Sequence, residues 1–189
     1  MMIETERLML RPWREDEAEA LFAFASDPRV GPDAGWPAHA SVDDSLAAIR
    51  RMNSEKECYA VALKPGGEPI GSIGLTEERR GPMRRRSAEM GFWIGPEYRG
   101  RGYAAEAALA LADRAFDRLG LRTLWCASYP GNAASERVQE KCGFRPKKRQ
   151  YDVSGYAPGT SERVNFSRLT ARRRRRAKKR QDRMKGTEK

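Results

Sequence analysis

Two glycines and two arginines alternate in the stretch Arg99-Gly100-Arg101-Gly102-Tyr103-Ala104, between a predicted strand and a predicted helix. The first backbone N–H groups of a helix have no internal partner and carry a partial positive charge. Gly100 and Gly102 would let this backbone approach an anion closely, and Arg99 and Arg101 add full positive charges. The stretch therefore predicts a phosphate or pyrophosphate site.

The glycine stretch differs from two common phosphate-binding patterns. No Gly-Lys-Ser or Gly-Lys-Thr follows it, and no third glycine completes the dinucleotide pattern Gly-x-Gly-x-x-Gly. Spacing alone also permits a simpler interpretation, in which the glycines only form a tight turn that lets the helix pack.

The elements around this stretch are predicted clearly. Ser87 to Ile94 alternates apolar and other residues as a strand does, and Tyr103 to Leu119 has helical spacing with Gly120 suited to its end. The other predicted elements are a strand around Met9, helices over Asp16–Ala25 and from Ser41, strands Cys58–Leu63, Ile70–Leu75 and Thr123–Tyr129, a helix ending at Cys142, and strands near Phe144–Val153 and Arg163–Leu169. Their order predicts one mixed α/β domain over residues 1–170.

Positive charge is concentrated at one end of the sequence. Of the formal net charge of +11, Ala171 to Lys189 contributes nine, so the rest of the chain carries only two. This segment has no apolar face, so we expect residues 171–189 to form a disordered basic tail that does not pack on the domain. Affinity for a polyanion, such as RNA or a ribosome, would then be a salt-sensitive property of the tail. The alternative is that the tail serves only as a solubilising extension.

Several classes of protein are disfavoured. Cys58, Cys126 and Cys142 are far apart and odd in number, which indicates reduced thiols in the cytoplasm. The single histidine, His39, lies in a turn-like stretch, and no cluster has metal-ligand spacing. No run of about 18 apolar residues and no apolar leader segment occurs, so we expect neither a membrane span nor secretion.

Four segments in order resemble the GCN5-related N-acetyltransferase (GNAT) superfamily. Arg99 to Ala104 matches its Arg/Gln-x-x-Gly-x-Gly/Ala signature, and Glu89 to Tyr98 looks like its fourth strand. Asn132-Ala133-Ala134-Ser135 with Glu140 to Phe144 is similar to its later motif, and Thr5 to Pro12 resembles the start of the Rim-type ribosomal-protein N-acetyltransferase branch. The resemblance runs from about Ile3 to Thr170. It implies one domain with a mostly antiparallel sheet, flanked by helices and splayed between the fourth and fifth strands.

The resemblance also implies the donor and the residues that bind it. Acetyl-coenzyme A would lie between the splayed strands, with no metal required. The implied cofactor-binding residues are Phe92, Trp93, Ile94, Arg99, Gly100, Arg101, Gly102, Tyr103, Ala104 and Asn132. Asn132 is equally suited to cap the following helix, and the two roles are compatible.

Two catalytic residues follow from the same resemblance, with alternatives. Glu89 is the first candidate to take the proton of the amine, directly or through water, although it could be a solvated or cross-strand charge. Ser135 would stabilise the departing thiolate, although it could be an ordinary helical serine. Many members carry a tyrosine acid where this chain has Gln139, so Ser135 or water is expected to serve instead. Glu106 is a weaker candidate base, and Tyr98, Tyr103 and Tyr129 stay open as acids.

The predicted function is acetyl transfer from acetyl-coenzyme A to a primary amine. The branch resemblance favours the α-amino group of a protein. The alternatives are acetylation of a drug or polyamine, and a non-catalytic module of the same fold that binds RNA or a ribosome through residues 171–189. The sequence leaves the oligomeric state open, a dimer included.

Overall fold

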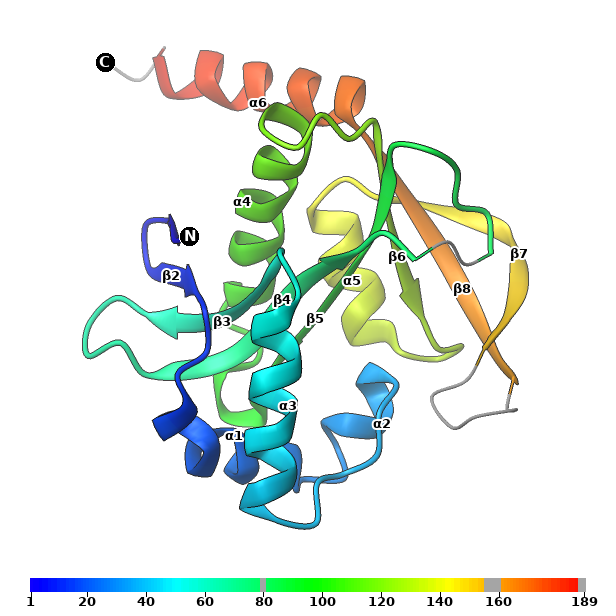
Figure 1. Ribbon diagram of the computed structural model, residues 1–189. Helices are drawn as coiled ribbons and strands as arrows, with labels where there is room; N and C mark the ends of the chain where they lie inside the picture. Colours follow the sequence, from blue (N-terminus) through cyan, green and yellow to red (C-terminus); the bar gives the residue numbers. More distant parts are fainter. Residues whose placement is uncertain (79–80, 155–160, 187–189) are drawn as a thin grey trace.

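The chain folds around one sheet of eight strands (Figure 1). The computed structural model describes residues 1–78, 81–154 and 161–186. The strands are β1 (Ile3–Glu4), β2 (Leu8–Arg11), β3 (Cys58–Leu63), β4 (Pro69–Thr76), β5 (Ser87–Ile94), β6 (Thr123–Ser128), β7 (Arg145–Ser154) and β8 (Ser161–Thr170). They lie in the order β1-β2-β3-β4-β5-β6-β8-β7, and every neighbouring pair is antiparallel except β5 and β6. The predicted mixed fold with a mostly antiparallel sheet is confirmed.

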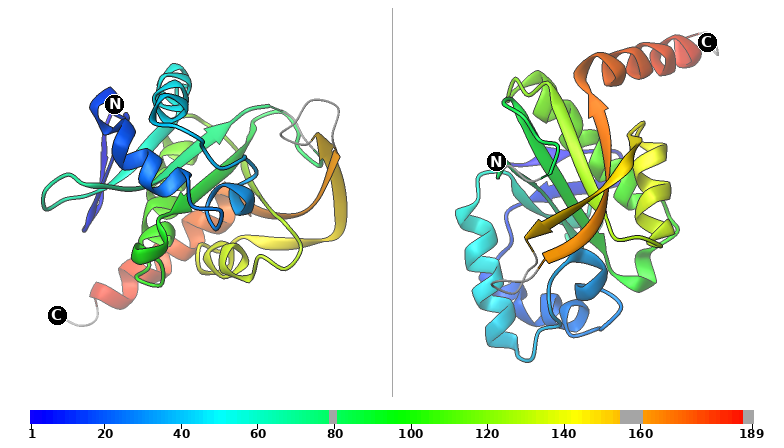
Figure 2. Two further views of the ribbon diagram at one scale, coloured as in Figure 1. Left: turned by 90° about the horizontal axis from the view of Figure 1, so that it is seen from below. Right: turned by 90° about the vertical axis from the view of Figure 1, so that its right-hand side faces the viewer.

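Helices cover both faces of the sheet. They are α1 (Ala18–Ala25), α2 (Gly31–Ala34), α3 (Val42–Ser54), α4 (Tyr103–Asp117), α5 (Ala133–Lys141) and α6 (Ala171–Gly186), with 3₁₀ turns at Glu15–Glu17 and Pro96–Tyr98. Helices α1 and α3 lie on one face, and α4 and α5 lie on the other (Figure 2). None of the helices in the described ranges is long and apolar enough to cross a membrane.

Helix α4 packs closely on the centre of the sheet because its inner face is built from small residues. Ala107, Ala108, Ala112 and Ala115 are buried against strand residues such as Leu10. Small side chains let the helix backbone approach the sheet, so the N-terminus of α4 is held firmly at the end of β5.

Local signals explain why several predicted elements have the predicted bounds. Strands β3 and β5 begin and end at the predicted residues. Helix α3 begins after Ser41, whose hydroxyl accepts a hydrogen bond from the Asp44 N–H at 3.1 Å, while the Asp44 carboxylate accepts one from the Ser41 N–H at 3.0 Å. This reciprocal pair is a capping box.

The prediction of a disordered tail is wrong for Ala171 to Gly186, which form helix α6. The sequence of the segment offers no apolar face, but α4 supplies acidic partners. Asp113 accepts hydrogen bonds from Arg174 at 3.0 Å and Lys178 at 3.1 Å, and only 8 % of Arg174 stays exposed. Residues 187–189 of the predicted tail lie outside the described residues.

Two small elements were missed in the sequence. Strand β1 pairs with β2 through Ile3 and Glu4, and α2 is a four-residue helix in a stretch for which no element was predicted. Helix α2 matters for the site described next, because it forms part of its wall.

Candidate functional site

Strands β5 and β6 pair for only three residues and then separate. Ser87, Ala88 and Glu89 pair with Thr123, Leu124 and Trp125, and the ladder ends there. The β6 side of Met90 to Ile94 therefore faces an opening instead of a neighbouring strand. Strands β5 and β6 correspond to the fourth and fifth strands of the prediction, which did not include the short β1. The predicted splay of the sheet is therefore confirmed by this register.

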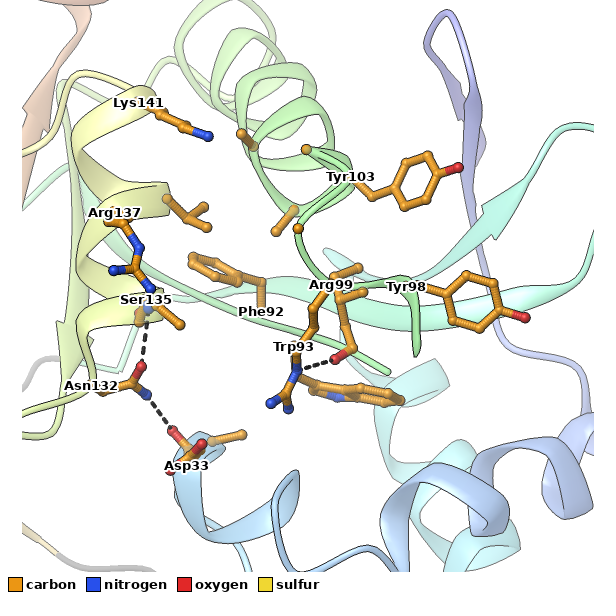
Figure 3. Close-up of a pocket in the computed structure, with 18 of the residues that line it drawn as sticks. Asp33, Phe92, Trp93, Tyr98, Arg99, Tyr103, Asn132, Ser135, Arg137 and Lys141 are labelled. Carbon is orange, nitrogen blue, oxygen red and sulfur yellow. Dashed lines mark hydrogen bonds between the residues drawn. The ribbon is translucent and has the colours of Figure 1, made fainter. Parts of the chain in front are cut away.

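A cavity of about 320 Å³ lies in this opening (Figure 3). Its walls come from the end of β5, the loop before α4, the first turn of α4, and helices α2 and α5. The lining residues are Val30, Asp33, Ala34, Phe92, Trp93, Ile94, Tyr98, Arg99, Gly100, Gly102, Tyr103, Ala104, Ala105, Asn132, Ala134, Ser135, Arg137, Val138 and Lys141. The structure thus brings together nine of the ten predicted cofactor-binding residues; the exception is Arg101.

The loop before α4 has a conformation that depends on its glycines. Gly100 and Gly102 have φ angles of +79° and +83°, which side-chain-bearing residues rarely adopt. A Cβ placed on Gly100 would meet no atom within 4 Å, so the space above this backbone is open. Gly102 is the N-cap of α4, and the first N–H groups of the helix lie at the cavity wall. This is an anion-binding arrangement.

The two arginines of the glycine stretch have different positions. Arg99 lines the cavity, where its guanidinium donates hydrogen bonds to the carbonyl oxygens of Ile94 at 3.0 Å and Arg29 at 3.1 Å. Arg101 lies outside the lining, with its guanidinium 5.7 Å from the centre of the Tyr98 ring. Only Arg99 of this pair is placed to put its charge in the cavity.

Two further cations line the cavity and were missed in the sequence. Arg137 and Lys141 lie one turn apart on α5, facing the glycine loop (Figure 3). Their i, i+4 spacing after the Asn-x-x-Ser motif is the signal that could have identified them. With Arg99 on the facing wall, they put three cations in the lining against the single carboxylate of Asp33.

Glu106 is occupied by contacts that hold the glycine loop in place. Its carboxylate accepts hydrogen bonds from the Thr5 hydroxyl at 2.6 Å, the Arg7 N–H at 2.9 Å and the Arg7 guanidinium at 2.7 Å. Partial burial raises the pKa of Glu106, but these hydrogen bonds outweigh it and hold that pKa below its ordinary value. Arg7 also donates to the Arg101 carbonyl at 3.1 Å and lies 4.6 Å from the Tyr103 ring centre. Glu106 does not line the cavity.

Asn132 caps α5 on the opposite wall. Its Oδ1 accepts a hydrogen bond from the Ser135 N–H at 3.0 Å, and its Nδ2 donates to the Asp33 carbonyl at 3.5 Å (Figure 3). The helix-capping interpretation of Asn132 is confirmed. The bond to Asp33 joins α5 to α2 across the mouth of the cavity.

Ser135 is held by the residue one turn further along α5. The Gln139 Nε2 donates a hydrogen bond to the Ser135 Oγ at 3.0 Å. Gln139 is only 2 % exposed, and its Oε1 has no hydrogen-bond partner among the described residues. With one lone pair of Ser135 accepting from Gln139, the serine hydroxyl is free to donate its own hydrogen.

The three tyrosines of interest direct their hydroxyls elsewhere. The Tyr98 hydroxyl donates to Glu68 at 2.6 Å, which raises the pKa of Tyr98. The Tyr103 hydroxyl points away from the cavity in Figure 3. Tyr129 donates to Glu162 and does not line the cavity. Ser135 is therefore the hydroxyl that the structure places at the cavity wall between α5 and β5.

Glu89 lies at the point where β5 and β6 separate, outside the cavity lining. It is 6 % exposed, so the alternative of a solvated surface charge is wrong. A Cβ placed on Gly91, two residues along the same face of β5, would meet nothing within 4 Å, so the space beside Gly91 is open. Burial, with a smaller effect of the Glu89 charge, raises the pKa of the Cys126 thiol well above its ordinary value.

The single histidine and the three cysteines do not line the cavity. His39 lies 2.8 Å from the Ser45 hydroxyl, and burial lowers its pKa. Within the described residues, no three His, Cys, Asp or Glu side chains gather in a group that could hold a metal ion. Cys58, Cys126 and Cys142 are free thiols.

Comparisons with known proteins agree with this geometry. Residues 7–145 match the family model described as an acetyltransferase (GNAT) domain. The uncharacterized N-acetyltransferase YoaA of Bacillus subtilis is 30 % identical over 164 residues, covering 83 % of this chain and 91 % of that protein. A putative ribosomal-protein-serine acetyltransferase from Vibrio cholerae superposes with a TM-score of 0.75 at 23 % identity, covering 90 % of this chain and 97 % of that chain. A spermidine N-acetyltransferase from Vibrio cholerae, in complex with CoA and spermine, superposes with a TM-score of 0.72 at 18 % identity, covering 90 % and 99 %.

Proposed function

The chain belongs to the acetyltransferase (GNAT) family, and from this premise we propose that it transfers the acetyl group of acetyl-coenzyme A to the α-amino group of a protein. The observation that carries the proposal is the opening between β5 and β6, which leads to a positively charged glycine loop at the N-terminus of α4. That opening offers an unpaired strand edge for an amide-containing arm and an anion site at its end.

The residues present fit acetyl-coenzyme A. Gly100 leaves open a backbone surface before α4 that a pyrophosphate requires, Gly102 gives the turn its positive φ, and Arg99 adds charge beside it. Arg137 and Lys141 suit further phosphate oxygens on the opposite wall. Arg101, outside the lining, is proposed to contribute through its backbone in the loop.

The remaining donor contacts come from the two walls of the opening. The main chain of Phe92, Trp93 and Ile94 would hydrogen-bond the pantetheine arm as a strand would, and Asn132 Nδ2 would bind the same arm while Oδ1 keeps its cap. When bound, acetyl-coenzyme A supplies the acetyl group as a thioester. Tyr103 and Ala104 provide N–H groups of the first helical turn.

Ser135 is proposed to stabilise the sulfur that leaves. The Gln139 amide occupies one lone pair of the Ser135 oxygen, so the serine hydrogen is free to point into the cavity. A hydrogen bond to a developing negative charge stabilises it more strongly than a neutral one. Gln139 cannot itself act as an acid, so its role is to position Ser135.

Glu89 is proposed to take the proton of the amine, directly or through one water. The burial of Glu89 and its position where β5 and β6 separate support such a relay. An α-amino group with a pKa of about 7.7–8.0 is partly neutral at pH 7, whereas a lysine amine with a pKa of about 10.4 is almost fully protonated. A modest base therefore suffices for a protein N-terminus.

The near-neutral body gives no particular reason to expect a polycationic acceptor, since residues 1–170 carry a formal net charge of only +2. Acetylation of a small amine stays the alternative, because relatives of this fold include the spermidine enzyme named above.

One experiment tests both halves of the proposal. Acetyl-coenzyme A binding is measured by calorimetry, and thiol release is followed with N-terminal peptides, polyamines and aminoglycosides. We expect binding, and turnover that is highest on peptides with a free α-amino group and absent on the same peptides with a blocked N-terminus. Binding with turnover only on polyamines would favour the alternative function. The absence of both acetyl-coenzyme A binding and turnover would refute the enzyme proposal.

A further inference from the structure

A second cluster of arginines lies beside the start of α6, although the two are far apart in sequence. Arg84, Arg85 and Arg86 precede β5 and are exposed. The Arg122 N–H donates to the Arg86 carbonyl at 2.8 Å, and the Ala171 N–H donates to the Arg122 carbonyl at 3.1 Å. These two bonds place the arginine triplet, the loop before β6 and the first turn of α6 at one end of the sheet.

The arginine triplet is held in a defined shape. Arg86 has a φ angle of +59°, uncommon for a residue other than glycine, and its guanidinium donates two hydrogen bonds to the Gly120 carbonyl at 2.7 and 3.1 Å. A cavity of about 390 Å³ lies beside it, lined by Arg84, Arg85 and Arg86 with Glu77, Ser87 and Leu119 to Leu121, so three cations face one carboxylate. The triplet is therefore an ordered basic surface.

Helix α6 extends this surface away from the body. Its contacts with α4 involve Arg174, Arg175 and Lys178, which pair with Asp113 and Asp117. The second half of α6 projects beyond α4 in Figure 1 and stands clear of the sheet in the right-hand view of Figure 2. We call the following exposed residues the cationic end: Arg84, Arg85, Arg86, Arg118, Arg122, Arg172, Arg173, Arg176, Lys179 and Arg180.

We propose that the cationic end binds the phosphate backbone of a double-stranded nucleic acid. Helix α6 is about 24 Å long at 1.5 Å per residue, and duplexes carry one negative charge per about 1.7 Å, so many phosphates face it at once. Arginines dominate the surface, and the guanidinium fork matches phosphate oxygens. Contacts to phosphates do not distinguish one base sequence from another, so we expect binding without sequence specificity.

The composition of the cationic end argues against other polyanionic partners. A membrane-surface helix needs an apolar face with Trp, Phe or Leu, and Met184 is the one large apolar residue of α6. Single strands are bound by stacking bases on aromatic rings, and α6 and the triplet contain no aromatic residue. A duplex bound through its phosphates needs neither feature.

Nucleic acid bound here would not occupy the acetyl-coenzyme A cavity. The cavity lies at the N-terminus of α4, and Asp113 and Asp117, near the C-terminus of α4, hold α6. Along α4, Asp113 lies about 15 Å and Asp117 about 21 Å from Tyr103 in the cavity lining. The inference therefore does not depend on the proposed catalytic function.

The test measures fluorescence anisotropy of a short duplex RNA, and of a duplex DNA of equal length, with the full chain over a range of potassium chloride concentrations. We expect both duplexes to bind, with affinity falling steeply with salt. The variant Arg172→Gln/Arg176→Gln/Lys179→Gln/Arg180→Gln keeps helix-forming residues and should bind about tenfold more weakly or worse. Its salt slope should be shallower by about 1 for each phosphate that the variant no longer neutralises.

The matched control removes four cations elsewhere, in Arg50→Gln/Lys56→Gln/Lys64→Gln/Arg163→Gln, and should bind as the parent does. The double variant Arg84→Gln/Arg85→Gln tests the triplet with α6 intact and should also weaken binding. Acetyl-coenzyme A affinity should be unchanged in all three. Equal binding by parent and α6 variant, or binding of anionic vesicles without binding of either duplex, would overturn the proposal.

Discussion

The Gln139 amide donates a hydrogen bond to the Ser135 hydroxyl at 3.0 Å, one turn apart on α5, and the Gln139 carbonyl oxygen has no partner among the described residues. A buried amide with one unpaired oxygen is costly, and its hydrogen bond to a cavity serine supports the proposed positioning role. Two variants separate this role from simple packing.

The first variant is Ser135→Ala. If the serine hydroxyl stabilises the departing sulfur, kcat should fall on the order of 10²-fold while the acetyl-coenzyme A Kd stays unchanged. Stopped-flow thiol release and calorimetry measure the two quantities. Ser54→Ala, which removes an exposed hydroxyl on α3, should leave both unchanged. An unaltered kcat in Ser135→Ala would assign Ser135 a purely structural place in the helix.

The second variant is Gln139→Met, which keeps most of the side-chain length and removes both polar groups. The loss of one neutral hydrogen bond should lower kcat about tenfold, whereas Tm should hold or rise because the unpaired oxygen is gone. Opposite changes in kcat and Tm are the signature of positioning. A parallel fall of both would indicate that Gln139 only supports packing.

A third prediction concerns the glycine loop. Gly100→Ala and Gly66→Ala both introduce a Cβ at positive φ, +79° and +84°, with no atom within 4 Å of it. Each should therefore cost about 1 kcal/mol of unfolding free energy. Only Gly100→Ala should weaken acetyl-coenzyme A binding, since Gly66 lies in the turn between β3 and β4. Equal Kd values for the two variants would exclude the loop as the phosphate site.

A fourth prediction concerns Glu89. Glu89→Gln keeps the shape of the buried side chain and removes its capacity to accept a proton. We expect kcat on a peptide amine to fall about 10²-fold at pH 7, with the loss shrinking as pH rises and the amine deprotonates without help. A pH profile of kcat from pH 6 to pH 9 measures this. A constant ratio of parent to variant across that range would argue against the proton-relay role.

A fifth prediction assigns Glu106 to stability. Because hydrogen bonds from Thr5 and Arg7 outweigh partial burial and hold the pKa of Glu106 below its ordinary 4.5, the unfolded chain binds the proton more readily. The stabilisation is fully present above about pH 4.5 and is lost as pH falls through the lower folded pKa. Glu106→Gln should lower the unfolding free energy by about 1–2 kcal/mol at pH 7 and less below about pH 4.

Urea unfolding at pH 7 and at a pH below about 4 measures the effect of Glu106→Gln on the unfolding free energy. Asp152→Asn is the matched control, since it removes an exposed carboxylate paired with Arg163 and should change the unfolding free energy by less than about 0.5 kcal/mol at either pH. A Glu106→Gln effect no larger than that of Asp152→Asn would remove the anchoring role of Glu106.

Strong local signals account for the parts of the fold that the sequence predicted well. Strand β5 alternates cleanly and is followed by a glycine, and α3 has its capping residues at the right spacing, so both were identified. Helix α6 was predicted as disordered because its partners, Asp113 and Asp117, lie on α4 and leave no trace in the sequence of α6. Its stability is a property of two elements together.

The residues of the candidate site also fall into two groups: those with a local signal in the sequence and those whose position depends on how the elements pack. The glycine loop has its own signature, so the chain alone predicted five residues that line the cavity: Arg99, Gly100, Gly102, Tyr103 and Ala104. Asp33 was missed because its position in the wall depends on how α2 packs against α5. Arg101 shows the converse: its neighbours suggested a phosphate contact, but the turn at Gly102 directs its side chain over Tyr98.

The wall of the opening opposite β5 depends on a strand that comes late in the chain. Strand β6 pairs with β5 through three residues but with β8 through six, from Thr123–Thr170 to Ser128–Asn165. During synthesis β5, α4, β6 and α5 emerge from the ribosome first, and β6 then lacks its longer partner. The donor-binding opening should therefore be completed only once Thr170 has emerged, so nascent chains that stop before β8 should not retain acetyl-coenzyme A.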